Sequence, residues 1–260
     1  VLGSATPDLE TSFRTTRKEI VRLDLPERIA RRPLPEVEIV DMQQEPRPRG
    51  KPAILSRTLR SAIATTLAAE QQAILFLNRR GFARSAYCFA CGHSLQCKHC
   101  DIALVYHASG GRQLPEDPDQ GELRCHYCGF QVEPKTSCEK CGSSEGALLG
   151  FGTERVEEEI GAMVPQARIA RLDADTSARR GSQRNILAAF HRRQTDILIG
   201  TQMVAKGHDF PGVNLVGILL ADTGLHFPDF RAAERTWQLL TPVSYTHLRA
   251  HETDSYLVCR

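Results

Sequence analysis

The chain has 260 residues, a hydrophobic fraction of 41% and a formal net charge of +2 at neutral pH. No apolar run reaches the roughly 18 residues that a membrane-spanning helix needs, so the sequence predicts no such helix. Its length allows one large or two small domains, and its composition is ordinary for a soluble α/β protein.

The first part of the chain contains short strand-like runs and one helix signal. Residues 20–23 and 37–40 are expected to form strands, and the proline-rich segment 42–52 a linker. Ser56 can cap a helix that continues to about Ala69, because apolar residues recur at spacings of four. A buried strand is predicted at 73–77.

Beyond residue 150, helices and strands alternate. Helices are predicted at 153–163, 182–191 (with Ile186, Leu187 and Phe190 inward) and 230–240, and strands at 168–172, 196–200 and 216–221. Alternation of this kind indicates a parallel sheet with helices on both faces.

Eight of the nine cysteines form four Cys-x-x-Cys pairs between these two parts. The pairs are Cys88/Cys91, Cys97/Cys100, Cys125/Cys128 and Cys138/Cys141. Two cysteines on a tight turn can direct both sulfurs at one tetrahedral ion, and glycines after three of the pairs can supply positive φ. We therefore expect two structural zinc ions rather than the disulfide framework of a small secreted domain.

Loop lengths limit which pairs can share an ion. Only five residues separate the first two pairs, which is a tight return for two turns facing one metal. If that pairing is excluded, the first pair joins the third or the fourth. A nested arrangement would place Cys88, Cys91, Cys138 and Cys141 on one ion and Cys97, Cys100, Cys125 and Cys128 on the other. His93, His99 and His126 lie beside these cysteines and are expected to be supporting or surface groups.

The zinc load bears on charge and on chemistry. Eight thiolates contribute −8 and two zinc ions +4, which moves the formal net charge from +2 to near −2. Overall charge therefore gives no argument about nucleic acid. Because eight sulfurs for two ions leave no open coordination position, a zinc-dependent hydrolase is disfavoured.

The loop after strand 196–200 carries polar side chains at the carboxyl end of a predicted parallel strand. It contains Thr201, Gln202, Lys206, Gly207 and Asp209. Ligands bind at this edge of open parallel sheets, and these groups suit contact with phosphate and a metal–nucleotide complex. Taken alone, the loop could also be an ordinary connection.

Motifs along residues 1–240 resemble those of one helicase family. Ser-Ala-Thr at 4–6 resembles the third motif of superfamily-2 helicases, and 200–211 resembles their fifth. The segments 73–82, 150–154, 172–176 and 230–235, with the cysteines between the first two, follow the order found in the primosomal protein N′ family of replication-restart helicases.

This resemblance implies a RecA-like helicase lobe with an inserted Cys-rich module that binds two zinc ions in the nested pairing. Residues 1–52 would end the first RecA-like lobe and form a linker, 53–87 and 142–240 would form the second lobe, and 88–141 the insert. Residues 241–260 do not match the family and are expected to be a sequence artefact.

The resemblance also implies an ATP-dependent 3′→5′ DNA helicase that remodels stalled forks and initiates primosome assembly. ATP and Mg²⁺ would bind the full-length protein. Partners would be single-stranded and forked DNA, primosome proteins and the replicative helicase loader, in the bacterial cytoplasm at the nucleoid. Ser4 and Thr6 would couple nucleotide state to DNA grip, while the inter-lobe face would be lined by Thr201, Gln202, Lys206, Gly207 and Asp209.

Two family features are missing. The phosphate-binding loop and the acidic magnesium motif would precede Val1, and residues 241–260 replace an arginine element that would reach the γ-phosphate. We expect this C-terminal-half fragment to be inactive by itself. The alternative is a non-enzymatic zinc-ribbon module that binds DNA or protein, and the sequence before Val1 would discriminate between the two.

Overall fold

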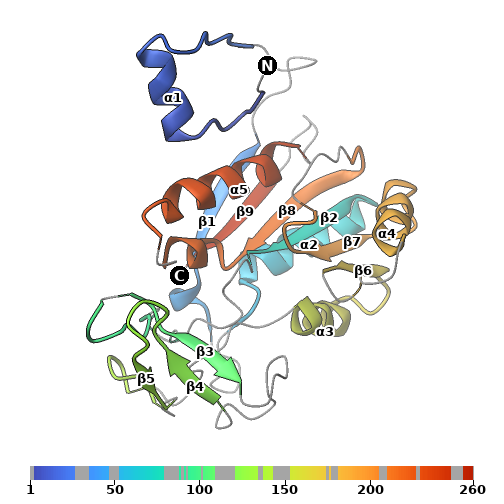
Figure 1. The fold of residues 1–260 in the computed structure, drawn as a ribbon. Coiled ribbons are helices and arrows are strands. Elements are labelled where there is room, and N and C mark those ends of the chain that lie inside the picture. The colour runs from blue at the N-terminus through green and yellow to red at the C-terminus, as the bar shows by residue number, and fades with distance from the viewer. Residues whose placement is uncertain are drawn as a thin grey trace.

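The computed structural model of the chain contains two sheets (Figure 1). One has six strands and is parallel throughout, and the other has three antiparallel strands. The residues that the structure describes are 3–26, 35–46, 53–78, 88, 91, 93–100, 102–108, 121–133, 137–142, 153–173, 176, 181–204, 210–226, 229–246 and 254–259.

The six-stranded sheet has the order β1-β9-β8-β2-β7-β6. Because every neighbouring pair is parallel, all carboxyl ends of the strands lie at one edge. The predicted α/β class with a parallel sheet is confirmed. The strands are β1 (Glu36–Asp41), β2 (Gln72–Leu77), β6 (Ile169–Leu172), β7 (Ile197–Gly200), β8 (Val213–Leu219) and β9 (Asp254–Cys259).

Strand β2 lies between β7 and β8, and all six of its residues are buried. Its alternate side chains enter two cores. Leu75 and Leu77 pack in the core that contains residues of α2 (Arg57–Ala68) and α3 (Thr153–Met163). Ile74 and Phe76 pack in the core that contains residues of α4 (Ser182–His191) and α5 (Ala232–Thr246). Helices therefore cover both faces of the sheet, as the sequence predicts.

The helices before and after the insert form where periodicity predicts them. The bounds of α3 and α4 match the predicted ranges 153–163 and 182–191. In α4, Phe190 is fully buried, and Ile186 and Leu187 pack against the same core. At the start of α2, the Ser56 hydroxyl accepts a hydrogen bond from the backbone N–H of Leu59 at 3.0 Å, as a capping residue should.

The predicted strand at 20–23 is wrong. The backbone there is a bend followed by irregular structure, and Val21 and Leu23 are 88% and 85% exposed. A strand needs a neighbouring backbone for its N–H and C=O groups, and no strand of the described residues pairs with this segment. Sequence reasoning also missed α1 (Leu9–Thr16), whose N-terminus is capped by Asp8 through the N–H of Thr11 at 2.6 Å.

Other elements differ in their ends. Strand β8 begins at Val213 rather than 216, and α5 extends from Ala232 to Thr246 rather than over 230–240. A short 3₁₀ helix, η2 (Met42–Gln44), begins the predicted linker, of which 47–52 lie outside the described residues. Within the predicted artefact 241–260, α5 continues and β9 pairs with β1 and β8. The assignment of that segment stays a prediction.

The three-stranded sheet lies within the cysteine-rich segment. Its strands are β3 (Val105–Ala108), β4 (Gly121–Arg124) and β5 (Gln131–Val132), in that order. Leu104, Tyr106 and Leu123 form a small core with Cys97 and Cys125. Strands at these positions were not predicted from the sequence, because each is very short.

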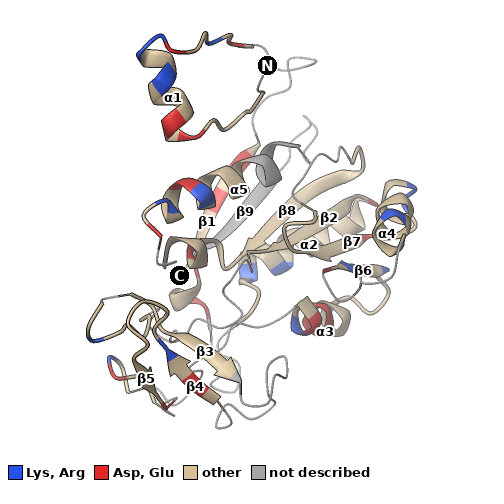
Figure 2. Cartoon of the chain, in the orientation of Figure 1, with Lys and Arg blue, Asp and Glu red and all other residues tan. Residues whose placement is uncertain are grey.

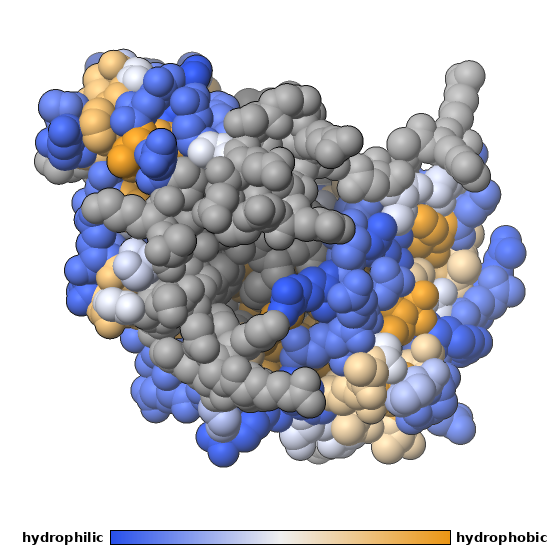
Figure 3. Space-filling model, turned by 90° about the horizontal axis from the view of Figure 1, so that it is seen from below, coloured by the Kyte–Doolittle hydropathy of each residue, from blue (hydrophilic) through white to orange (hydrophobic). Residues whose placement is uncertain are grey.

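Charged residues are concentrated on the helices and loops, and the central strands of the large sheet contain few (Figure 2). On the face seen from below, hydrophilic residues form most of the described surface, and hydrophobic residues appear as separate patches (Figure 3). Among the described residues, no helix combines the length and the apolar character needed to cross a membrane.

The cap of α2 gives a test of the fold. Ser56→Ala should lower the free energy of unfolding by about 1 kcal/mol, because the buried helix start loses its hydrogen-bond acceptor. Asp8→Ala is the matched control, since it removes the cap of α1, a helix with no buried residue. Urea denaturation should show a lower midpoint for the first variant only, and equal midpoints would contradict this assignment.

Candidate metal centres and the carboxyl edge of the sheet

The eight cysteines gather in two groups of four. In each group all four sulfurs lie within 4.8 Å of one another. The membership is nested: the outer group joins the first and last pairs, and the inner group joins the two middle pairs. The outer group contains Cys88, Cys91, Cys138 and Cys141, and the inner group contains Cys97, Cys100, Cys125 and Cys128.

The sulfur separations fit a shared metal ion. Sγ of Cys88 lies 3.7 Å from Sγ of Cys141, and the corresponding distance from Cys97 to Cys128 is 3.6 Å. Four sulfurs at ~2.3 Å from one tetrahedral zinc ion are ~3.8 Å apart. A disulfide would require ~2.05 Å, and all eight cysteines are free. The donor set of four thiolates suits zinc.

Backbone turns position these sulfurs. The N–H groups of His99, Tyr127 and Lys140 each lie 3.4 Å from the sulfur of the cysteine two residues earlier. Such bonds stabilise a thiolate and fix its direction. Gly129 and Gly142, which follow the third and fourth pairs, have φ of +73° and +70°. The expected positive φ is thus present at both, while Gly92 lies outside the described residues.

The same backbone groups set the protonation of the thiols. Burial raises the pKa of Cys125. Hydrogen bonds from the backbone N–H groups of Cys128 and Tyr127 and from neighbouring thiols have a larger combined effect, and they lower the pKa to about 7. The pKa of Cys138 is lowered to about 7 in the same way. The hydrogen bond with Cys128, followed by burial, raises the pKa of Cys100 to about 12. Each group therefore has one sulfur close to the thiolate form, and a bound cation would displace protons from others.

At the other end of the chain, the segment of Ser4 and Thr6 leads into α1. Ser4 Oγ accepts a hydrogen bond from the N–H of Thr6 at 3.1 Å, and Thr6 is buried. Helix α1 then contacts the start of α5. The N–H of Leu9 donates to Glu234 at 2.6 Å, and Arg231 pairs with Glu10 at 3.1 Å. The structure thus places the start of α1, a few residues after segment 4–6, against segment 230–235.

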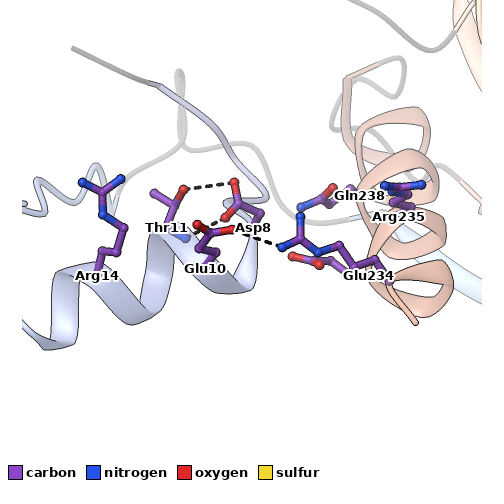
Figure 4. Close-up of a pocket in the computed structure, with 8 residues that line it drawn as sticks. Asp8, Glu10, Thr11, Arg14, Glu234, Arg235 and Gln238 are labelled. Atoms are coloured by element: carbon purple, nitrogen blue, oxygen red, sulfur yellow. Dashed lines mark hydrogen bonds and ion pairs between the residues drawn. The ribbon is translucent and has the colours of Figure 1, made fainter. Parts of the chain in front are cut away.

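A polar cavity of about 260 Å³ lies between these two helices. Figure 4 shows Asp8, Glu10, Glu234 and Gln238 near the space between the helices, with Arg14 and Arg235 at its two sides. The lining side chains include both acidic and basic residues. They form ion pairs and hydrogen bonds that link the two helices across the cavity. It is lined by Asp8, Glu10, Thr11, Arg14, Arg231, Glu234, Arg235 and Gln238.

Thr201 and Gln202 lie at the carboxyl edge of the sheet, directly after β7. The N–H of Thr201 points to the carbonyl of Leu172, the last residue of neighbouring β6, at 3.4 Å. A Cβ on Gly200 would meet that carbonyl oxygen at 2.9 Å, so the turn requires glycine. The remaining predicted residues of this loop, Lys206, Gly207 and Asp209, lie outside the described residues.

A buried carboxylate at this edge was given no role by sequence reasoning. Asp173 follows β6 and accepts hydrogen bonds from the Thr153 hydroxyl at 2.6 Å and the Thr176 N–H at 2.9 Å, and Arg171 pairs with it. These contacts tie the start of α3 to the loop after β6. An aspartate directly after a buried strand, with threonine three residues later, is a turn signal that could have identified it.

The chain is similar in sequence to one protein-family model and to several curated bacterial proteins. The model of the PriA DNA helicase Cys-rich region (CRR) domain matches residues 97–113 and 119–132, which contain the inner cysteine group. Curated relatives called "Replication restart protein PriA" are 46% identical in Bacillus subtilis, 41% in Synechocystis and 42% in Treponema pallidum. These matches cover 94%, 99% and 94% of this chain and 29%, 31% and 35% of the relatives. The chain therefore spans about a third of their length.

Solved structures are more distant. The chain is similar to S. cerevisiae Dbp5 bound to RNA and ADP BeF3, with 11% identity and a TM-score of 0.41, over 98% of this chain and 43% of that one. The Pyrococcus furiosus Hef helicase domain gives 14% identity and a TM-score of 0.34, over 78% and 25%. Likeness at this level carries no argument about ligands or activity.

The nested grouping predicts which metal each cysteine affects. Cys138→Ser should reduce bound zinc from two equivalents to one, because three sulfurs remain in the outer group while the inner group is untouched. Zinc per chain is measured by atomic emission on purified protein. Cys259→Ser, outside both groups, should retain two equivalents. Loss of both ions in the first variant, or of neither, would show that the groups are assembled differently.

Asp173 should make stability sensitive to acid. Burial raises its pKa, but the hydrogen bonds from Thr153 and Thr176 and the charge of Arg171 outweigh it, so the pKa lies below its ordinary 3.8. The stabilisation is therefore complete above about pH 3.8 and is lost as pH falls through the folded-state pKa. Asp173→Asn should lower the thermal midpoint at pH 7 and reduce its decline in acid. The exposed Asp24→Asn is the control, and an identical profile in both variants would contradict the role of Asp173.

Proposed function

We propose that this chain, which belongs by sequence to the PriA family of replication restart proteins, is part of an ATP-dependent DNA helicase. In this proposal the intact protein moves 3′→5′ on single-stranded DNA, remodels stalled forks and initiates primosome assembly. The observation that carries the proposal is the 46% identity to the Bacillus subtilis relative over 94% of the chain. The chain spans 29% of that relative, so the proposal concerns the activity of a longer parent protein.

Zinc binding is the first part of the proposal. One zinc ion would be held by the outer cysteine group and one by the inner group, both as structural ions with closed coordination. The sulfur separations of 3.6–3.7 Å and the N–H contacts to the sulfurs support this role. Zinc would hold the turns of 88–141 together, and the ions would take no part in a chemical step.

A division of the chain follows from the same relationship. Residues 53–87 and 142–240 would form the second RecA-like lobe, 88–141 the insert and 1–52 the end of the first lobe. The separate core of the insert supports this, because the cluster around Tyr106 shares no residue with the two cores of the large sheet. The contact between α1 and α5 would then join the two lobes.

Nucleotide and DNA contact would come from the edge of the sheet and from the segment before α1. Mg²⁺–ATP would bind between the lobes of the parent, with the loop after β7 on one side. The location of Thr201 at the carboxyl edge supports a role for that loop. Contacts to nucleotide or DNA are proposed for Thr201, Gln202, Lys206, Gly207 and Asp209, and coupling of nucleotide state to DNA for Ser4 and Thr6.

Partners of the parent follow from its proposed task. They would be single-stranded and forked DNA, primosome proteins and the loader of the replicative helicase. Because the relatives are bacterial, the place of action would be the bacterial cytoplasm at the nucleoid. The insert would act through shape and specific contacts, since its described part carries both basic and acidic residues (Figure 2).

Asp209 tests the proposal in the intact parent. Asp209→Ala should abolish DNA-stimulated ATP hydrolysis. The free energy of unfolding should fall by no more than the loss of a turn cap costs, about 1 kcal/mol, so the melting temperature should change little. The expectation rests on the loop's place at the carboxyl edge, where a carboxylate can contact the nucleotide's metal ion or orient water. Turnover and melting temperature are measured on the same preparation.

Glu158→Ala is the control, since Glu158 is exposed on α3 and belongs to no proposed contact. It should retain the turnover of the parent. A stable Asp209→Ala protein with unchanged turnover would remove this loop from the mechanism. Absence of DNA-stimulated ATP hydrolysis in the unaltered parent would contradict the helicase proposal and favour the non-enzymatic zinc-ribbon alternative.

A further inference from the structure

The segment that follows α1 exposes a row of large apolar side chains. Val21, Leu23 and Leu25 are 88%, 85% and 95% exposed, and they alternate with Arg22 and Asp24, which form an ion pair at 2.7 Å. In an extended chain this alternation places the apolar side chains on one side and the ion pair on the other. Single exposed apolar residues are common on protein surfaces, but three on one side of a short segment indicate a contact surface.

The backbone of this segment is also available for pairing. No hydrogen bond between described residues involves a backbone N–H group from Val21 to Leu25. A row of unpaired N–H and C=O groups is what the edge of a sheet offers to a new neighbouring strand. Pro26 ends the row, because proline has no N–H group to donate.

Helix α1 has an uncovered apolar face of its own. Leu9 and Phe13 are four residues apart, so they lie on the same side of the helix, and they are 72% and 59% exposed. None of the eight residues of α1 is buried. The hydrogen bond from Leu9 to Glu234 and the ion pair of Arg231 with Glu10 join α1 to α5, yet both apolar side chains remain largely exposed.

A defined turn fixes the helix and the segment relative to each other. Lys18 has a φ of +59°, and the N–H of Glu19 donates to the carbonyl of Arg14 at 3.0 Å. A left-handed residue with this hydrogen bond back to the last turn is a common way to end a helix. Ion pairs of Arg14 and Arg17 with Glu19, at 3.3 and 3.2 Å, brace the turn. Residues 9–25, called the N-terminal arm below, therefore consist of a helix, a fixed turn and an unpaired segment.

We propose that the N-terminal arm docks on the remainder of the first RecA-like lobe in the longer parent protein. Its apolar side chains would enter the core of that lobe, and the backbone of 21–25 would pair with a neighbouring strand there. This inference rests on the proposed function, in which residues 1–52 end the first lobe. The chain spans only 29% of the Bacillus subtilis relative, which leaves most of a parent of that length to supply the partner surface.

Docking would give the contact between α1 and α5 a mechanical role. Because the arm carries Leu9 and Glu10, its attachment to the first lobe would tie that lobe to Glu234 and Arg231 of the second. The N-terminal arm would then be the part of the first lobe that holds the start of α5.

Amide hydrogen exchange tests the docking on two unaltered proteins, the 260-residue chain and its intact parent. The amides of 21–25 should exchange about 100-fold or more slowly in the parent, because pairing and burial protect them there. In the chain they should exchange as fast as in an unstructured peptide. The amides of β2, a buried strand, are the internal reference and should be protected in both proteins. Equally fast exchange of 21–25 in both proteins would overturn the proposal.

Leu23→Asp gives a second test in which the length of the protein is the matched control. The change should lower the thermal midpoint of the parent by several degrees, because a charge enters a covered apolar surface. It should leave the midpoint of the chain unchanged, since Leu23 is exposed there. Equal shifts in the two proteins would contradict the docking, and if the parent variant does not fold, the exchange measurement on the unaltered proteins decides.

Two further outcomes identify which proposal fails. Light scattering should show that the chain is a monomer, and a dimer with protected 21–25 would overturn the inference, because a second copy would then be the partner. A parent that hydrolyses ATP in response to DNA but leaves 21–25 unprotected would contradict the docking alone. A parent that protects 21–25 without such hydrolysis would contradict the helicase proposal alone.

Discussion

Complete burial of β2 is the constraint that arranges the large sheet. A strand with no exposed side must have a helix layer on each face and a strand on each edge, and β2 has all four. Because its neighbours are parallel to it, the loops after β6, β7 and β8 leave from one edge. Asp173 and Thr201 lie together there for that reason, and the cysteine-rich insert begins just beyond the end of β2.

The insert depends on a different interaction. Among its described residues, the apolar core of the insert is a small cluster around Leu104, Tyr106 and Leu123, and small domains usually need metals or disulfides in addition to such a core. The free cysteines exclude the disulfide solution in the eight described thiols. In the proposed zinc-bound form, metal–thiolate bonds supply this additional stability. In the nested arrangement, the outer group closes the base of the insert and the inner group joins β3 and β4 at their cysteine turns.

Periodicity predicted the helices and strands that bury apolar side chains regularly, such as α3 and α4, and loop length limited the pairing of the cysteines. Three features depended on partners distant in sequence. The run at 20–23 has strand-like composition without a strand to pair with, and β9 takes its place between β1 and β8 through backbone contacts. The contact between His107 and His126 was also hidden, because the two residues are 19 positions apart and meet only through the β3–β4 register.

The central claim is that metal binding stabilises the insert and apolar burial stabilises the sheet, independently of each other. Amide hydrogen exchange before and after chelation of zinc measures both at once. The account predicts that chelation removes protection from the amides of β3, β4 and the cysteine turns, while β2, β7 and β8 keep theirs. Simultaneous loss of protection in the sheet and the insert, or full protection of the insert without metal, would contradict it.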